Sequence, residues 1–301
     1  MLALLGPTGV GKTGAGIKLC RELKGEIISC DSRQIYKHLD IGTAKPSPEE
    51  LRAVPHHLIN LIEPGEMFSA YRFRIMAEEV IDKLFSEGKQ PLVLGGTGLY
   101  FQALSEGLFE TPEHDPELRD ELEQTAEKEG NEVLWERLNE LDPDAAQKIT
   151  KSDRFRIIRA LEIHKTTGKA KSVLAESGNY APVRYKFVII GLNLPRKVLY
   201  DRINSRVDSM LEAGWEEETR KLIKNSCLNP RNIKKLMGYN RLYEYIEGQI
   251  DYSYCVEKIK QAHRNYAKRQ LTWFKRVKGI QWLSAADPDL IKKVLELFYL
   301  Q

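Results

Sequence analysis

The sequence has no long apolar run. None of its 301 residues belongs to a stretch approaching the roughly 20 apolar residues that a membrane-spanning helix needs. Residues 1–6 are too short for a secretory signal, and a glycine-rich motif follows them at once. These absences argue against a membrane protein or an exported one. We therefore expect a cytoplasmic protein.

The sequence is also poor in metal-binding patterns. No two of its four cysteines have CxxC spacing, which argues against a zinc knot; they are Cys20, Cys30, Cys227 and Cys255. Reduced thiols are the expected state in the cytoplasm. His56 and His57 are adjacent at the start of an expected strand, so their side chains should point to opposite faces and cannot share a metal. We expect a structural role for both histidines.

The net charge of +3 hides a strong asymmetry. Residues 110–144 carry 14 acidic and 3 basic side chains, and residues 148–171 carry 2 acidic and 8 basic ones. Residues 184–278 hold 21 basic and 10 acidic side chains. Such segments can be solvated helical faces, or they can bind a polyanion larger than a mononucleotide through counterion release. The charge count alone leaves both interpretations open.

Strand and helix patterns alternate over the first hundred residues. Apolar strands are expected at residues 2–5, 26–31, 57–62 and 91–96. Helices are expected from Lys12 to Leu23, and from a cap at Ser69 to a stop at Gly88. This alternation predicts an α/β protein with a parallel sheet flanked by helices. Ligands bind beyond the carboxyl ends of such strands, so residues at those ends should share one cleft.

The alternation stops near residue 108 and a purely helical pattern follows. A strand pattern returns at residues 185–192, and a last one is expected at residues 280–283. We therefore expect a P-loop NTPase-like core formed by residues 1–110 and 180–301. Residues 111–179 are expected to form an inserted all-helical domain.

A complete phosphate-binding loop follows the first strand. The pattern G-x-x-x-x-G-K-[ST] is matched by eight residues: Gly6, Pro7, Thr8, Gly9, Val10, Gly11, Lys12 and Thr13. Its glycines allow backbone N–H groups to surround a diphosphate at a helix N-terminus. Lys12 would contact the outer phosphate, and the Thr13 hydroxyl is a candidate Mg²⁺ ligand. The loop does not reveal whether its phosphate belongs to a nucleotide.

The features of a typical nucleotide hydrolase are incomplete. Such an enzyme places an acidic residue at a strand end as a further Mg²⁺ ligand, and Asp31 could serve in that way. The strand at residues 91–96 ends instead in two glycines. No clear arginine finger or lid signature is visible.

Several motifs together resemble one enzyme family. The order GPTGVGKT, DSRQIYKHLDIGTAKP, PHHLINLIEP, FSAYRFR, LVLGGTGLY, RFRIIRALEIH, MGYNRLYEYIEG and YAKRQLTWFKR is similar to that of the tRNA dimethylallyltransferases. The match covers nearly the whole chain, and DSxxxYxxxDIGTAKP is very specific. The eukaryotic relatives add a C-terminal zinc finger that this sequence lacks, so it resembles the bacterial form.

The resemblance implies an activity. Enzymes of this family transfer the prenyl group of dimethylallyl diphosphate to the exocyclic amine of the adenosine just 3′ of the anticodon. The P-loop would then hold a leaving group, with Lys12, the Thr8 hydroxyl and Mg²⁺ at Thr13 stabilising the expelled diphosphate. Arg206 is implied to reach the diphosphate, one helical turn after Arg202, although both could instead be exposed helix arginines. Asp31 is the candidate general base, with a second-shell role at Mg²⁺ as the alternative.

The resemblance also implies contacts with the tRNA anticodon stem–loop. The implied residues are Asp31, Ser32, Arg33, Gln34, Thr97, Arg119, Phe155, Arg156, Ile157, Ile158, Arg159, Lys235, Leu236, Met237, Gly238, Tyr239 and Asn240. The inserted domain should grip the RNA with its basic stretch and turn its acidic stretch away. Arg156 and Arg159 could alternatively brace the domain through local acidic partners. Trp273 and Phe274 are expected to be core residues.

Three alternatives remain open. A prenyltransferase acting on free adenine nucleotides would need neither the insertion nor the basic C-terminal half. A P-loop kinase of a small metabolite could also use Asp31 as its base. A non-catalytic RNA-binding protein could keep the loop only for folding. We expect a monomer, because no obvious interface helix is present.

Overall fold

The computed structural model describes residues 1–108, 112, 115–177, 182–225 and 230–300. The chain divides into two compact units: Met1–Ser105 with Arg184–Gln301, and Glu106–Val183. The boundaries expected from the sequence lie within a few residues of this division.

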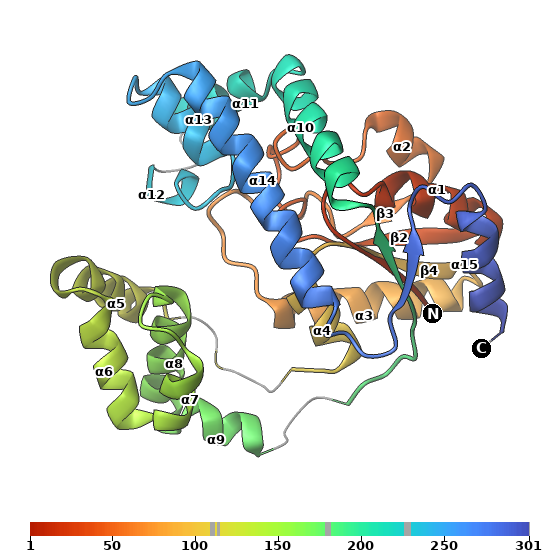
Figure 1. Ribbon diagram of the computed structural model, residues 1–301. Helices are drawn as coiled ribbons and strands as arrows, with labels where there is room; N and C mark the ends of the chain where they lie inside the picture. Colours follow the sequence, from red (N-terminus) through yellow and green to blue (C-terminus); the bar gives the residue numbers. More distant parts are fainter. Residues whose placement is uncertain (109–111, 113–114, 178–181, 226–229, 301) are drawn as a thin grey trace. The chain divides into compact units, whose positions relative to one another are not determined.

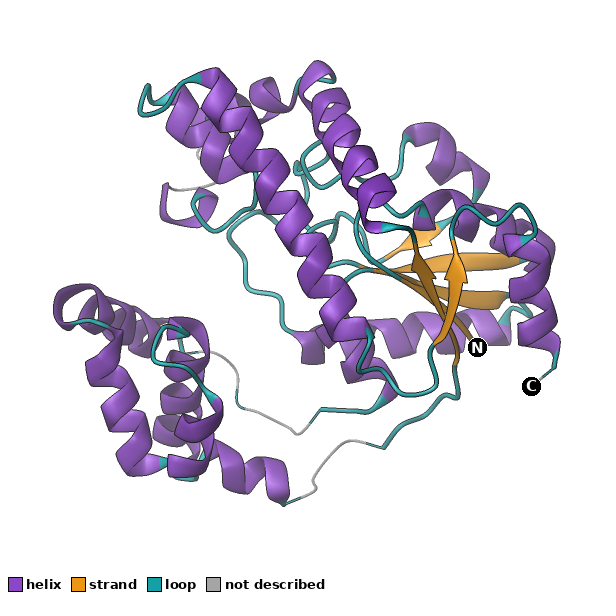
Figure 2. Ribbon diagram, in the orientation of Figure 1, coloured by secondary structure: helices purple, strands orange, loops and turns teal. Residues whose placement is uncertain are grey.

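The larger unit is built on a six-stranded parallel sheet (Figures 1 and 2). Its strands are β1 (Leu2–Leu5), β2 (Gly25–Cys30), β3 (His56–His57), β4 (Gln90–Gly95), β5 (Val188–Asn193) and β6 (Gln281–Ser284). Their order is β3-β2-β4-β1-β5-β6, so β1 lies between β4 and β5. The P-loop therefore leaves the middle of the sheet. The predicted fold class is confirmed.

Ten helices of the larger unit lie in the part of the chain that the structure describes. They are α1 (Lys12–Leu23), α2 (Pro48–Ala53), α3 (Ala70–Ser86), α4 (Gly98–Ser105), α10 (Arg196–Glu212), α11 (Trp215–Lys224), α12 (Pro230–Ile233), α13 (Tyr239–Ile246), α14 (Tyr252–Phe274) and α15 (Leu290–Tyr299). Helices α1 and α15 pack together against one face of the sheet. Helices α3 and α4 pack against each other, and α3 contacts β2 and β4. A second apolar cluster joins α10, α11, α13 and α14 around the fully buried Trp215.

The helix boundaries follow the expected chemistry. Helix α1 spans the predicted residues, beginning directly after Gly11. Ser69 caps α3 by accepting the backbone N–H of Arg72 at 3.0 Å, and Gly88 follows with a left-handed φ of 69°. Both termini of this helix agree with the sequence pattern.

The strand expected at residues 57–62 is much shorter in the structure. Pairing ends at His57, because Leu58 and Asn60 adopt left-handed backbone angles of 61° and 53°. A single bridge between Tyr36 and Ile62 continues the contact beyond this turn. An apolar pattern does not reveal such a local reversal of the backbone, and the predicted length was wrong.

The regular elements of the smaller unit, in its described residues, are all helices. Its helices are α5 (Pro116–Glu129), α6 (Asn131–Leu141), α7 (Pro143–Lys148), α8 (Arg154–Thr167) and α9 (Lys171–Glu176). The first four enclose an apolar core of leucine, isoleucine and alanine side chains. Asp142 caps α7 and also accepts the backbone N–H of Ser172 at 2.9 Å, which ties α9 to α7.

The described cysteines are buried free thiols, and Cys227 lies outside the described residues. Burial raises the pKa of Cys20 to about 12 and also raises that of Cys30, so neither forms a thiolate readily. Across the same described residues, no helix is both long and apolar enough to cross a lipid bilayer.

Two glycines of α1 should respond to alanine in opposite directions. A Cβ on Gly16 would lie 2.0 Å from Leu94 Cδ1, whereas a Cβ on Gly14 would meet nothing within 4 Å. We expect Gly16→Ala to lower the free energy of unfolding by about 1–3 kcal/mol through overpacking. Gly14→Ala should be neutral or raise it by up to about 1 kcal/mol through helix propensity. Urea denaturation of both variants checks this, and equal effects would contradict the packing.

Candidate active site

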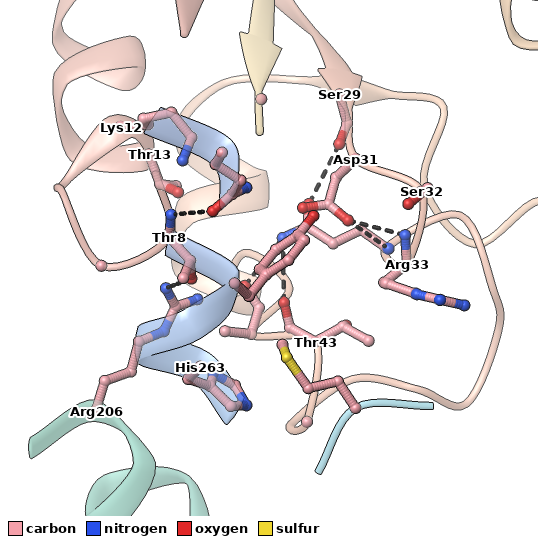
Figure 3. A pocket seen from close by; sticks show the side chains of 18 of the residues that line it. Thr8, Lys12, Thr13, Ser29, Asp31, Ser32, Arg33, Thr43, Arg206 and His263 are labelled. Carbon is pink, nitrogen blue, oxygen red and sulfur yellow. Dashed lines mark hydrogen bonds between the residues drawn. The ribbon is translucent and has the colours of Figure 1, made fainter. Parts of the chain in front are cut away.

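A pocket of about 430 Å³ lies in the larger unit at the carboxyl ends of β1, β2 and β4. Its wall contains P-loop residues, the segment from Asp31 to Gln34, Gly95, and residues of α10 and α14. Figure 3 shows Thr8, Lys12, Thr13 and Arg206 on one side of the view and Asp31 on the other. The pocket brings together the P-loop and Asp31, as the strand ends predict.

The P-loop depends on its glycines. Gly9 has a φ of 78° and Gly11 a φ of 102°, which is the left-handed region that favours glycine. A Cβ on Gly9 would also lie 2.8 Å from Ile203 Cγ1. The loop therefore fits closely beneath α10, and a larger residue at position 9 would displace it.

Lys12 is held inside the curve of the loop. Its ammonium group donates hydrogen bonds to the carbonyl oxygens of Gly6 and Pro7, each at 2.9 Å. Burial lowers the pKa of Lys12 to about 8, and the nearby Asp31 carboxylate acts in the opposite direction. An ammonium group has three donors, so one remains for a phosphate oxygen.

Thr8 is fixed from two directions. Arg206 Nη1 donates to the Thr8 hydroxyl at 3.1 Å, and the Thr8 backbone N–H donates to Gln270 Oε1 at 2.8 Å (Figure 3). Burial lowers the pKa of Arg206, whereas the Asp31 charge raises it. Arg206 is therefore a pocket residue. Arg202 is exposed, as the alternative interpretation of a surface arginine expects.

Gln270 also reaches the turn after β4. Its Nε2 donates to the carbonyl oxygen of Gly96 at 2.8 Å, and a Cβ on Gly96 would lie only 2.3 Å from that nitrogen. Gln270 lies within the YAKRQLTWFKR motif but was not among the predicted site residues. Its position in the sequence could have indicated its role. Gln270 lies on the buried stripe of α14 with Ile259, Ala267 and Phe274, where a polar residue needs hydrogen-bond partners.

Asp31 is oriented by the backbone that follows it. Its Oδ1 accepts the N–H groups of Arg33 at 2.8 Å and Gln34 at 3.3 Å, shown as dashed lines in Figure 3. Within the described residues, the other oxygen, Oδ2, accepts no hydrogen bond. One oxygen thus fixes the carboxylate while the second is available to a ligand in the pocket.

Thr97 holds the Asp31 segment from the neighbouring turn. Its Oγ1 accepts the backbone N–H of Ser32 at 2.9 Å, and the backbone N–H groups of Gly96 and Thr97 donate to the carbonyl oxygen of Cys30. The contacts of Thr97 and Ser32 in this structure are therefore internal to the protein.

Gln34 likewise bonds within the protein. Its Nε2 donates to the carbonyl oxygens of Thr43 at 3.4 Å and Ala44 at 3.1 Å, and Ser29 donates to its Oε1. Lys45 anchors the same loop by contacting Asp40 at 2.7 Å. The DIGTAKP segment therefore forms a pocket wall built largely from backbone.

The MGYN segment provides a neighbouring part of the pocket wall. Lys235, Leu236, Met237 and Tyr239 line the pocket, whereas Asn240 lies at the start of α13. Gly238 packs beneath Trp215. On α14, Phe274 is fully buried, as predicted.

Trp273 is half-buried, and its indole lies 2.2 Å from where a Cβ on Gly98 would be. Trp273 thus packs closely on α4, but its partial exposure places it outside the buried core, and the core role predicted for it was wrong.

The residues implied for the helical unit separate into surface and core. Phe155 is 63% exposed, and the guanidinium of Arg119 lies 5.0 Å from the centre of its ring. Ile157 and Ile158 are fully buried, so their side chains support the core instead of reaching a ligand.

Arg156 and Arg159 of α8 differ in the same way. Arg156 is exposed and contacts Asp153 at 2.9 Å. Arg159 contacts the fully buried Glu162 at 2.8 Å and the carbonyl oxygen of Pro112 at 2.8 Å. Arg159 therefore braces the helical unit through a local acidic partner, which is one of the two roles considered above. The exposed Arg156 makes only a surface pair, so this role applies to it only weakly.

The two histidines of β3 point apart, as predicted. His57 Nε2 lies 2.6 Å from Glu26, which also contacts Lys89 at 2.7 Å. His56 lines the pocket, and its Nδ1 lies 2.8 Å from the carbonyl oxygen of Val54. The second histidine is structural, while the first closes the pocket wall.

The pocket could hold a hard cation only with the help of a ligand. In the described parts of the chain, no group of three or more histidine, cysteine or carboxylate side chains could hold a metal. The Thr13 hydroxyl faces the pocket at the start of α1, and Asp31 lies across from it. Mg²⁺ binds in this way, through one or two protein oxygens together with substrate phosphates and water.

Known proteins resemble this chain over almost its full length. A family model described as IPP transferase matches residues 34–277. A tRNA dimethylallyltransferase of Acetivibrio thermocellus is 42% identical over 297 residues, covering 98% of this chain and 95% of the relative. Another, of Geobacillus thermodenitrificans, is 42% identical over 300 residues, covering 99% and 95%.

Solved structures agree with this assignment. The tRNA isopentenylpyrophosphate transferase of Bacillus halodurans is 38% identical, with a TM-score of 0.71, covering 99% of this chain and 94% of that one. A eukaryotic dimethylallyltransferase acting on tRNA is 29% identical, with a TM-score of 0.79, covering 100% and 77%. The P-loop pocket and these similarities point to the same enzymes, and the chain belongs to the IPP transferase family.

Proposed function

We propose that this protein transfers the dimethylallyl group of dimethylallyl diphosphate to the exocyclic amine of the adenosine 3′-adjacent to the anticodon of tRNA. The observation that carries the proposal is the Asp31 carboxylate facing a P-loop across one pocket. The family relationship supplies the substrates, since the relatives are named for this transfer to tRNA.

The P-loop side of the pocket suits an expelled diphosphate. As the allylic C–O bond breaks, its electron pair passes to the leaving oxygen and negative charge grows on the diphosphate. Lys12 and Arg206 are already oriented before this charge develops, which favours the transition state over the ground state. Mg²⁺, held by Thr13 and the diphosphate oxygens, would add positive charge at the same place.

The opposite side suits an amine that must lose a proton. The nitrogen forms the new C–N bond, and Asp31 Oδ2 would accept the proton that leaves it. Oδ1 cannot turn away easily, because two backbone N–H groups hold it. A second-shell role for Asp31 at Mg²⁺ is the alternative.

The acceptor base must leave its stack to enter the pocket, which costs less in an anticodon loop than in a duplex. The exposed Phe155 and Arg156 of the helical unit would contact the stem–loop. We also propose that the protein acts as a monomer in the cytoplasm.

The choice of donor tests the function directly. Purified protein should transfer label from dimethylallyl diphosphate to unmodified tRNA with Mg²⁺, and should transfer little to AMP. ATP should support no comparable phosphoryl transfer or hydrolysis, because an acidic strand end suited to hydrolysis is absent from β4. Rapid metabolite- or tRNA-dependent ATP hydrolysis without prenyl transfer would instead favour the kinase alternative.

Asp31→Asn should separate chemistry from binding. Asparagine can keep the Oδ1 contacts to Arg33 and Gln34 while its amide cannot accept the proton. We expect the single-turnover rate to fall by about 10²–10⁴, with the affinities for tRNA and donor retained. Asp31→Ala should fall at least as far, since it also removes the turn contacts. A near-normal single-turnover rate in either variant would rule out the base assignment.

Arg156 and Arg159 should behave differently although they lie one turn apart. Arg156→Ala should weaken tRNA binding and reduce its salt dependence by about one phosphate equivalent, with thermal stability unchanged. Arg159→Ala should destabilise the protein by about 3–5 kcal/mol, because it leaves Glu162 buried without this partner. Donor affinity serves as the control for both. Intact salt dependence in Arg156→Ala would contradict the RNA contact.

A further inference from the structure

The carboxylate of Glu218 on α11 is the centre of four hydrogen bonds. Its Oε2 accepts the backbone N–H groups of Asp40 at 3.0 Å and Ile41 at 2.8 Å. Its Oε1 accepts the backbone N–H of Gly42 at 3.2 Å and the hydroxyl of Tyr239 at 2.6 Å. Three consecutive amides converging on one anion form a specific anchor, and each bond is strengthened by the charge.

The packing around this anchor is equally close. A Cβ on Gly42 would lie 2.1 Å from Trp215 Nε1 and 2.5 Å from Tyr239 Cζ. A Cβ on Gly238 would lie 2.1 Å from Trp215 Cη2. Gly42 and Gly238, one in each segment of the pocket wall, therefore pack against the fully buried indole of Trp215. The Glu218 carboxylate joins the two segments through its hydrogen bonds.

The anchored loop is connected to Asp31 through Gln34. Directly after Gly42, the carbonyl oxygens of Thr43 and Ala44 accept from Gln34 Nε2. The backbone N–H of Gln34 in turn donates to Asp31 Oδ1. A shift of the loop would therefore reach the carboxylate that faces the acceptor, while the P-loop shares none of these bonds.

We propose that Glu218 is a positioning residue for the transfer reaction. It holds residues 40–44 against residues 235–239, so that the acceptor base enters a pocket of fixed width and meets Asp31 at a fixed distance. It touches neither the diphosphate cradle nor the reacting atoms. This inference rests on the proposed function, because the acceptor side of the pocket is the part that Glu218 holds.

Glu218→Met tests the proposal, with Glu217→Met on the exposed neighbouring position as the matched control. We expect Glu218→Met to lower kcat/KM for tRNA by about 10–100-fold, since small displacements near reacting groups are costly. Glu218→Gln should lie in between, because its amide keeps one acceptor oxygen. The affinity for dimethylallyl diphosphate should stay within about two-fold of wild type in every variant.

A second comparison separates positioning from folding. Tyr239→Phe removes one donor to Glu218, and its effect on kcat/KM should largely disappear in the Glu218→Met background. All assays are run well below each variant's measured Tm, where a purely structural role would leave kcat and KM unchanged. A normal kcat/KM for tRNA in folded Glu218→Met, or a loss of donor affinity as large as the loss of kcat/KM, would overturn this inference and leave the proposed function standing. Absence of transfer by wild type and Glu217→Met would overturn the proposed function and the inference with it.

Discussion

The hydrogen bond from Thr8 to Gln270 joins residues 262 positions apart, and the arrangement of the pocket depends on it. Through the same amide, Gln270 also holds Gly96, and the turn that follows holds Ser32 beside Asp31. The phosphate side and the acceptor side are therefore braced by one side chain of α14. A site that works by preorganised donors needs such bracing, because donors that must move during the reaction lose their advantage.

The motif residues act mainly on one another. Gln34 binds the carbonyl oxygens of its own wall, Thr43 donates to the carbonyl oxygen of Leu39 at 2.5 Å, and Lys45 pairs with Asp40. Even Ala44 adopts a left-handed φ of 48°, a strained angle kept by the surrounding contacts. The length and specificity of DIGTAKP thus reflect the building of a wall, and few of its side chains remain for contact with a substrate.

Sequence patterns located the elements whose cause is local. The first strand, the P-loop, α1 and the Ser69 cap follow from apolar runs, glycines and capping chemistry. The prediction that the strand continues beyond His57 was wrong, because a hydropathy pattern does not reveal where the backbone reverses. Gln270 and Glu218 were missed for another reason: their partners are backbone groups of residues far away in the chain. A polar residue on the buried stripe of a helix can be recognised from sequence only by asking which groups could satisfy its hydrogen bonds.

Counting charges along the chain also has a limit that the helical unit makes clear. The acidic and basic stretches were expected to form separate faces, yet Lys151 pairs with Glu132 and Lys165 lies 3.5 Å from Glu121 across the helices. These side chains are mostly exposed, so the pairs are weak and phosphate could replace the carboxylates at little cost. The bond between Arg159 and the buried Glu162 cannot be exchanged so easily. If this unit contacts tRNA as proposed, its affinity would therefore come from surface pairs that can open and from the exposed Phe155, and less from the total number of basic residues.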